Sequence, residues 1–139
     1  TLCRDSVLLP PMLEAHLVDP ETVAQSNGIG TALDISAAAQ TRVFLITVSV
    51  TAVVEQESLQ VSIFGSADGQ TWPQKPLMTA PQVFYPGSVP VLLDLSRTAD
   101  VRFLRAHWDV NRWGRGYLTP RFVFGVEIRE VPREYLATP

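Results

Sequence analysis

This chain of 139 residues has one cysteine, one lysine and two histidines, and these shortages exclude several kinds of site. Cys3 has no second cysteine with which to form an internal disulfide, and a single domain of this length needs none to hold a core. Cys3, His16 and His107 show no metal-ligand spacing. No glycine-rich loop is followed by the helical pattern that phosphate binding needs. We therefore expect no metal and no cofactor.

The chain also lacks a long apolar segment. Its longest apolar run, Val43 to Val54, has 12 residues and includes Thr47, Ser49 and Thr51. This run is too short and too rich in hydroxyl groups to cross a bilayer as a helix, so we expect no membrane span. The N-terminus has no basic region followed by an apolar core, and we therefore expect no signal peptide.

No group of residues has the spacing of a catalytic site. Ser66 lies in the sequence Gly-Ser-Ala-Asp-Gly, which is not the G-x-S-x-G of a nucleophile elbow. A carboxylate pair for glycoside hydrolysis would have to face across a cleft. Turn chemistry already explains the aspartates at strand ends, which are Asp68, Asp94, Asp100 and Asp109. We expect a protein that is not an enzyme.

Lysine is nearly absent: ten of the eleven basic residues are arginine. Eight arginines lie between Arg97 and Arg133 with only four acids, so this segment carries about +4 and the remainder about −7. Arginine is favoured at interfaces, since its planar guanidinium is weakly hydrated and makes several hydrogen bonds. Ordinary exposed strand positions would explain the arginines equally well. The net charge of −3 argues against nucleic acid as a partner.

What the chain does have is strong alternation of apolar and polar residues, which is typical of strands with one buried face. Segment 43–54 alternates in this way, and so do segments 89–95, 101–110 and 121–131. In segment 101–110 the alternation predicts one face with Leu104, Ala106, Trp108 and Val110, and an opposite face with Arg105, His107 and Asp109. Frequent turn signals and almost no helical period predict an all-β fold, an antiparallel β-sandwich or jelly roll of seven or eight strands.

The clearest local motif is LQVSIFGSADGQTW, from Leu59 to Trp72. Its first half alternates as a strand does, and Asp68-Gly69 is a dipeptide that favours a tight hairpin turn. Thr71 and Trp72 are then expected to begin the return strand, which Pro73 limits. We therefore predict a structural hairpin built on four residues, Ser66, Asp68, Gly69 and Trp72.

Prolines at positions 10, 11 and 20 interrupt the first part of the chain. We predict an extended N-terminal arm over residues 1–30, a β-sandwich domain over residues 31–133 and a tail over residues 134–139. The arm is too apolar for a solvated tail. We expect it either to pack on its own domain or to reach onto a neighbour, and we favour the neighbour.

Two resemblances follow from the hairpin motif. The segment S-A-D-G-Q-T-W, followed later by V-R-F-L-R-A-H-W, resembles the hairpin and strand of discoidin (coagulation factor type C) domains. From Thr31 to Glu130 the order of TALDI, the hairpin, V-R-F-L-R-A-H-W-D-V and P-R-F-V-F-G-V-E-I is similar to a group of small β-sandwich proteins of tailed phages and virion-like assemblies. That second resemblance implies a non-enzymatic building block of a particle or fibre.

We therefore expect a structural protein that binds copies of itself or other subunits of a large assembly, in a virion-like particle or a complex assembled in the cytoplasm. A discoidin-like module that binds carbohydrate through the loop from Arg112 to Tyr117 is the alternative. The residues expected to contact partners are Leu8, Leu9, Met12, Leu13, Arg105, His107, Arg112, Trp113, Arg115 and Tyr117.

Overall fold

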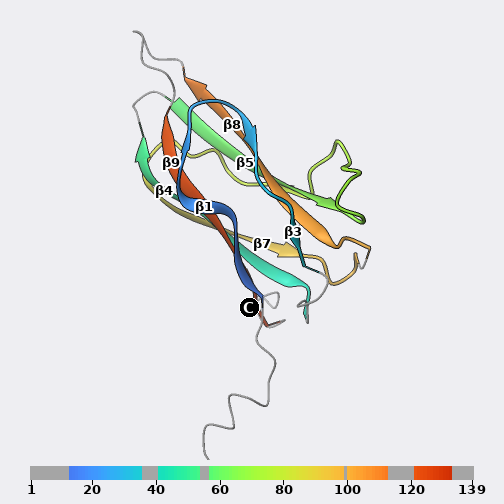
Figure 1. The fold of residues 1–139 in the computed structure, drawn as a ribbon. Helices are drawn as coiled ribbons and strands as arrows, with labels where there is room; N and C mark the ends of the chain where they lie inside the picture. Colours follow the sequence, from blue (N-terminus) through green and yellow to red (C-terminus); the bar gives the residue numbers. More distant parts are fainter. Residues whose placement is uncertain (1–12, 36–40, 54–56, 99, 113–120, 133–139) are drawn as a thin grey trace, which may run out of the picture.

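A computed structural model describes residues 13–35, 41–53, 57–98, 100–112 and 121–132. These residues form two antiparallel sheets packed face to face as a β-sandwich, and none of them is helical (Figure 1). The predicted all-β sandwich is confirmed. The described residues therefore include no helix long and apolar enough to cross a membrane.

The first sheet, called the β4 sheet, has the strand order β1 (Glu14–Ala24), β9 (Phe122–Glu130), β4 (Val43–Val53) and β7 (Gly87–Asp94). The second, called the β8 sheet, is built on the pair β8 (Phe103–Arg112) and β5 (Glu57–Ser66), to which three two-residue strands are added: β2 (Gly28–Ile29), β3 (Leu33–Asp34) and β6 (Met78–Thr79). The described residues form nine strands rather than seven or eight, because these short strands leave almost no periodic signal in the sequence.

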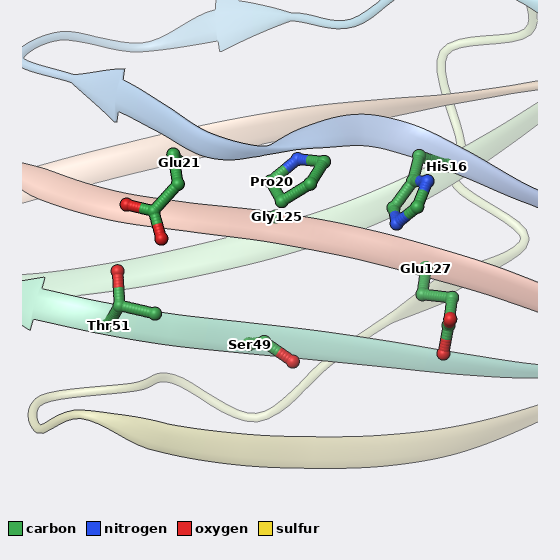
Figure 2. Close-up of a pocket in the computed structure, with 7 residues that line it drawn as sticks. All are labelled: His16, Pro20, Glu21, Ser49, Thr51, Gly125 and Glu127. Atoms are coloured by element: carbon green, nitrogen blue, oxygen red, sulfur yellow. The ribbon is translucent and has the colours of Figure 1, made fainter.

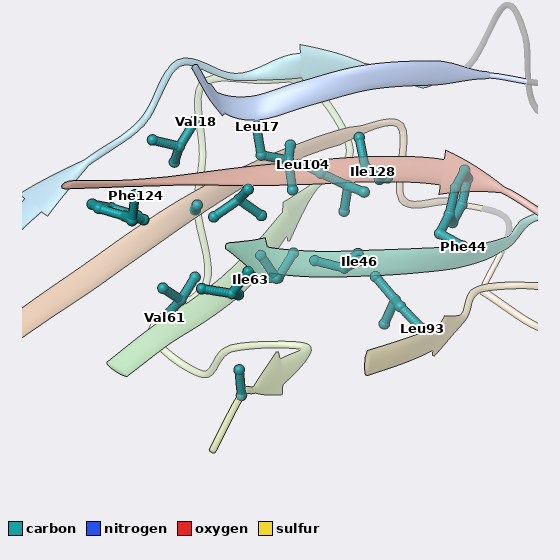
Figure 3. Close-up of a cluster of buried hydrophobic side chains, with 14 of the residues drawn as sticks. Leu17, Val18, Phe44, Ile46, Val61, Ile63, Leu93, Leu104, Phe124 and Ile128 are labelled. Carbon is teal, nitrogen blue, oxygen red and sulfur yellow. The ribbon is translucent and has the colours of Figure 1, made fainter. Parts of the chain in front are cut away.

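The core lies between the sheets and follows the alternation that the sequence shows (Figure 3). Along β4 the inward side chains are at most 3% exposed, and those of β9 are fully buried; they are Phe44, Ile46, Val48 and Val50, and Phe122, Phe124, Val126 and Ile128. The β8 sheet contributes Leu59, Val61, Ile63, Leu104 and Ala106. Each large apolar side chain buried in this way contributes about 1.5–3 kcal/mol, so this core is the main favourable contribution to the stability of the sandwich.

The prediction of an N-terminal arm over residues 1–30 is wrong for its described part. Strand β1 pairs with β9 from Glu14↔Arg129 to Ala24↔Phe122. Leu17 and Val18 are buried in the core, so residues 13–30 belong to the sandwich. Pro20 does not end the strand because the register shifts between Val18 and Thr22, and the proline sits within this bulge. Residues 1–12 lie outside the described part of the chain.

Gly125 of β9 makes this bulge possible. A Cβ atom at position 125 would lie 2.8 Å from the Cα of Pro20, so only glycine allows the two backbones to approach so closely. Glu21, next in the bulge, has a φ of 65°. The edge strand thus passes over β9 with an irregular backbone in the middle of its length.

A hydrogen-bonded polar cluster around the buried Glu130 closes one end of the sandwich. The carboxylate of Glu130, 2% exposed, accepts hydrogen bonds from the backbone N–H groups of Thr41 and Arg42, at 2.6 and 3.1 Å. The guanidinium of Arg42 donates to three carbonyl oxygens, those of Leu95, Thr98 and Val101, at 3.1, 2.7 and 2.7 Å. The cluster ties the start of β4 to the end of β9 and to the connection between β7 and β8.

Candidate functional site

The outer face of the β8 sheet carries the two predicted contact residues that the structure brings together. Arg105 and His107 point outward from β8, while Leu104 and Ala106, which alternate with them, are fully buried, as the alternation predicts. On the neighbouring strand β5, Phe64 lies opposite Arg105 and Ser62 lies opposite His107. This register places a cation, an imidazole and a phenyl ring side by side.

These groups and Trp72 form a continuous stack, which we call the Arg105 patch (Phe64, Trp72, Arg105 and His107). The guanidinium of Arg105 lies over the Trp72 ring, 4.1 Å from the ring centroid. Its Nε–H donates a hydrogen bond to Nε2 of His107 at 3.1 Å. The His107 ring stacks on Phe64 with centroids 4.0 Å apart and planes 29° apart. Each member is therefore held in place by the next.

The hydrogen bond from Arg105 determines the state of His107. Because Nε2 accepts, the imidazole is neutral and carries its proton on Nδ1. Partial burial lowers the pKa of His107, the charge of Arg105 lowers it further, and Asp109 acts in the opposite direction. The side chains of β5 and β2 beside His107 are Ser62, Phe64 and Ile29, none of which is charged. His107 is therefore neutral at pH 7.

Arg105 retains most of its hydrogen-bonding capacity. A guanidinium has five N–H groups, and only the one on Nε has a partner among the residues that the structure describes. The other four lie on the two terminal nitrogens, in the fork geometry that matches a carboxylate. The patch thus holds a cation in a fixed orientation without neutralising it.

The turn before Trp72 differs from the predicted hairpin. Oγ of Ser66 accepts from the N–H of Gly69 at 2.9 Å and donates to the carbonyl of Thr71 at 2.7 Å. Oδ1 of Asp68 accepts from the N–H groups of Gln70 and Thr71 at 2.9 and 2.8 Å, and these bonds lower the pKa of Asp68 to about 2. Gly69 has a φ of 78°, as a turn glycine should.

The chain does not return as a strand at Thr71, however. Pairing with β5 resumes only at β6, where Met78 lies opposite Ile63 and Thr79 lies opposite Ser62. Ser66, Asp68 and Gly69 build the turn as predicted, but Trp72 lies under Arg105. The loop closes on its own side chains, which leaves Trp72 free to reach the outer face of the sheet.

A second polar region lies on the outer face of the β4 sheet, around a cavity of about 160 Å³ that we call the Gly125 pocket. Its lining residues are His16, Pro20, Glu21, Ser49, Thr51, Gly125 and Glu127. Figure 2 shows Glu21 and Thr51 at one end, His16 and Glu127 at the other, and Pro20 over Gly125 between them. The sequence analysis did not predict this pocket, because three of the pocket residues belong to β1, which was expected to be part of an N-terminal arm. No group of acids, histidines and cysteines in the described ranges could hold a metal ion.

The remaining predicted contact residues do not join the patch. Leu13 packs against the core of its own domain, and its N–H and C=O groups bond to Glu130, at 3.4 and 2.8 Å. Arg112 ends β8 opposite Glu57. Six others lie outside the described residues, namely Leu8, Leu9, Met12, Trp113, Arg115 and Tyr117. Phe64 was not predicted, although its place between the inward Ile63 and Gly65 marks it as an outward aromatic residue.

Comparison with known proteins adds no relative: no protein-family model matches the chain, and no curated protein matches its sequence significantly.

Proposed function

We propose that this protein is a non-enzymatic structural subunit that assembles with copies of itself through the Arg105 patch. One observation carries the proposal: an arginine on an outer sheet face is held by an indole ring and an imidazole, and its other four N–H donors have no partner among the residues that the structure describes. Tryptophan and arginine are among the residues most enriched at the energetic centres of protein interfaces. Their orientation is fixed before binding, so little conformational entropy is lost on contact.

The sheet edges support contact through a face. An open strand edge can pair with another chain, but the edges of this sandwich are short or irregular. β2, β3 and β6 have two residues each, and β1 contains the bulge at Pro20. Assembly by strand addition is therefore disfavoured at these edges.

The remaining edge strand, β7, contains Pro90 in the middle of its length. The N–H of Leu95 donates to the carbonyl of Arg42, so Leu95 is hydrogen-bonded to the chain at the start of β4. Along an antiparallel pair every second residue is bonded to the neighbouring strand, and the residues between them direct their backbone groups away from it. Pro90 therefore falls among the residues whose backbone groups point toward the open edge, where it offers no N–H. This arrangement blocks a continuous ladder to a further strand.

The resemblance to β-sandwich proteins of tailed phages and virion-like assemblies suggests the setting, a particle or fibre in which such a subunit is a decoration, head or tail component. An assembly of that kind needs contacts rather than chemistry. The rigid sandwich would act as the scaffold, and its faces would provide the contacts.

Light scattering at micromolar concentrations tests the proposal. We expect the wild-type protein to form a multimer and Trp72→Ala to weaken it, since removing the ring frees the guanidinium of Arg105. Arg97→Ala, which removes an exposed arginine from the connection between β7 and β8, is the matched control and should leave the multimer unchanged. A wild-type protein that remains monomeric would refute the proposal.

Carbohydrate binding is the alternative function, and one observation favours it. Tyr85 is 76% exposed and lies beside Phe84, with ring centroids 6.4 Å apart. Sugar sites use such exposed rings. A glycan array with the wild-type protein, Tyr85→Ala and Trp113→Ala would decide, because sugar binding lost in either variant would support this function over assembly.

A further inference from the structure

We propose that residues 7–12 of one copy bind against the exposed rings of Phe84 and Tyr85 on a second copy. This stretch, which we call the Pro10–Pro11 segment, has the sequence Val-Leu-Leu-Pro-Pro-Met and precedes the described residues. Three of the residues that the sequence predicts to contact partners belong to it. The inference rests on the proposed assembly function and adds a second contact between copies to that of the Arg105 patch.

The receiving surface is a cavity of about 280 Å³ where the chain passes from β6 to β7, which we call the Tyr85 cavity. All of its lining residues belong to one segment, residues 82–89. Tyr85 is 76% exposed and Phe84 is 40% exposed, with ring centroids 6.4 Å apart and ring planes 50° apart. Two large exposed rings beside a cavity mark a surface suited to binding rather than to contact with water alone.

The two rings are held in place from both sides. Before them, Val83 is buried and exchanges two backbone hydrogen bonds with Leu59, at 2.8 and 2.9 Å. After them, Gly87 enters β7 and pairs with Val50 of β4. Only three residues lie between Val83 and Gly87, and the third is Pro86, whose ring fixes its φ. The rings are therefore positioned before a partner binds, which lowers the entropic cost of binding.

The chemistry of the Tyr85 cavity fits the Pro10–Pro11 segment. None of the residues that line the cavity is charged, and none of residues 7–12 is charged. Two consecutive prolines favour the polyproline II conformation, whose backbone carbonyl groups make no internal hydrogen bonds. Grooves lined by aromatic rings bind such segments. The amide of Gln82 and the hydroxyl of Tyr85 supply donors for the carbonyl groups.

The two partners of this contact lie at opposite ends of the sandwich. Leu13 is the first described residue, and its carbonyl accepts a hydrogen bond from the N–H of Glu130 at 2.8 Å. Glu130 pairs with Phe44 near the start of β4. Gly87, at the edge of the Tyr85 cavity, pairs with Val50 toward the other end of β4 (Figure 1). The Pro10–Pro11 segment is therefore attached at the end far from the cavity.

The length of the chain excludes this contact within one copy. The six steps along β4 from Phe44 to Val50 span about 20 Å. The three steps from Pro10 to Leu13 reach at most about 11 Å. The prolines thus cannot reach the cavity of their own copy, and each copy offers the segment at one end and the cavity at the other. Such a heterologous contact forms rings if it closes and filaments if it does not.

Two complementary variants of the full chain test the inference. The double variant Pro10→Ala/Pro11→Ala removes the prolines and keeps the cavity, whereas Tyr85→Ala keeps the prolines and removes a ring. Light scattering should show association weakened about tenfold or more in each variant, as for aromatic contacts at the centre of an interface. Leu92→Ala is the matched control, since it removes an exposed apolar side chain of β7 outside the cavity and should leave association unchanged. Circular dichroism checks that each variant is folded.

A peptide titration locates the contact. The peptide VLLPPM, added to the Pro10→Ala/Pro11→Ala protein, should shift the NMR signals of residues 82–89, and the matched peptide VLLAAM should not. Tyr85→Ala should bind VLLPPM about tenfold more weakly, because one of the two rings is lost.

The outcomes separate this inference from the proposed function. If Trp72→Ala weakens the multimer but Tyr85→Ala and the double proline variant do not, this contact is overturned and the assembly function stands. If Tyr85→Ala weakens the multimer but VLLPPM shifts no signal of residues 82–89, the Pro10–Pro11 segment is the wrong occupant and the inference is overturned. A wild-type protein that is monomeric and does not bind the peptide would overturn both proposals.

Discussion

Arg42 and Arg105 show how the same side chain serves two purposes in one sandwich. Arg42 directs its guanidinium at three backbone carbonyls within 3.1 Å, those of Leu95, Thr98 and Val101. Arg105 gives one N–H to His107 and covers a ring, and its terminal nitrogens have no partner within the described part of the chain. The first arginine completes the fold, whereas the second is positioned by the fold and available to another molecule.

The carboxylates divide in the same way. Glu130 is 2% exposed and accepts from backbone N–H groups of three different residues, Leu13, Thr41 and Arg42. Glu127, three positions earlier on β9, points outward into the Gly125 pocket. Glu127 and Glu130 are close in sequence, but strand alternation points their side chains toward opposite faces of the sheet. A polar residue is thus identified as structural by its partners rather than by its type.

The largest effect is expected when the buried carboxylate is removed. Glu130→Ala leaves backbone N–H groups of Thr41 and Arg42 without acceptors in the interior, and should lower the free energy of unfolding by about 3 kcal/mol. Urea denaturation measures this loss. Glu127→Ala on the same strand is the control, with an expected change within about 0.5 kcal/mol. Similar losses in the two variants would break the comparison.

A smaller difference is expected between the two arginines. Arg42→Gln cannot replace three hydrogen bonds to carbonyl oxygens and should cost about 2 kcal/mol of stability. Arg105→Gln gives up one cation–π contact and one hydrogen bond at a half-exposed site, and should cost less than about 1 kcal/mol. Thermal unfolding of the two variants side by side tests this order, and the reverse order would show that the Arg105 patch is itself a stabilising element.

Asp68 adds to the comparison of carboxylates a side chain that is exposed and yet accepts hydrogen bonds from the backbone. Its pKa is lowered to about 2 from 3.8, chiefly by hydrogen bonds from the N–H groups of Thr71 and Gln70. A carboxylate with a lowered folded-state pKa stabilises the fold above pH 3.8, and this stability is lost as the pH falls to about 2. Chemical denaturation between these pH values should show the loss, and Asp68→Asn should reduce the pH dependence. An unchanged slope would mean that the turn is equally stable with a protonated Asp68.

Local patterns in the sequence predict the sandwich and the faces of its long strands well. Period-2 alternation is a local property, so the inward residues of β4 and β9 and the outward Arg105 and His107 follow from it directly. Strand β1 could not be predicted from alternation, because Pro20 signals an interruption of the strand unless one knows that Gly125 lies beneath it. That contact joins residues over a hundred positions apart.

The candidate site was predicted in part for the same reason. Arg105 and His107 lie on one strand, and their shared face is visible in the sequence. Trp72 reaches them from a loop that closes through Ser66 and Asp68, and Phe64 reaches them through the register of β5 with β8. Strand register and loop path are set by the whole fold, so alternation alone could not bring these four side chains together.

The smallest and most local effect concerns His107, whose titration reports directly on Arg105. Burial and the neighbouring guanidinium lower the pKa of His107 below 6.5, so the unfolded chain binds a proton first as the pH falls below that value. Stability should therefore decrease as the pH falls from 6.5 toward the folded-state pKa. Arg105→Gln removes the adjacent charge and should raise the pKa of His107, which titration of the imidazole signals by NMR can measure. If the pKa does not rise in Arg105→Gln, burial alone controls His107, and the link between the two side chains would have to be abandoned.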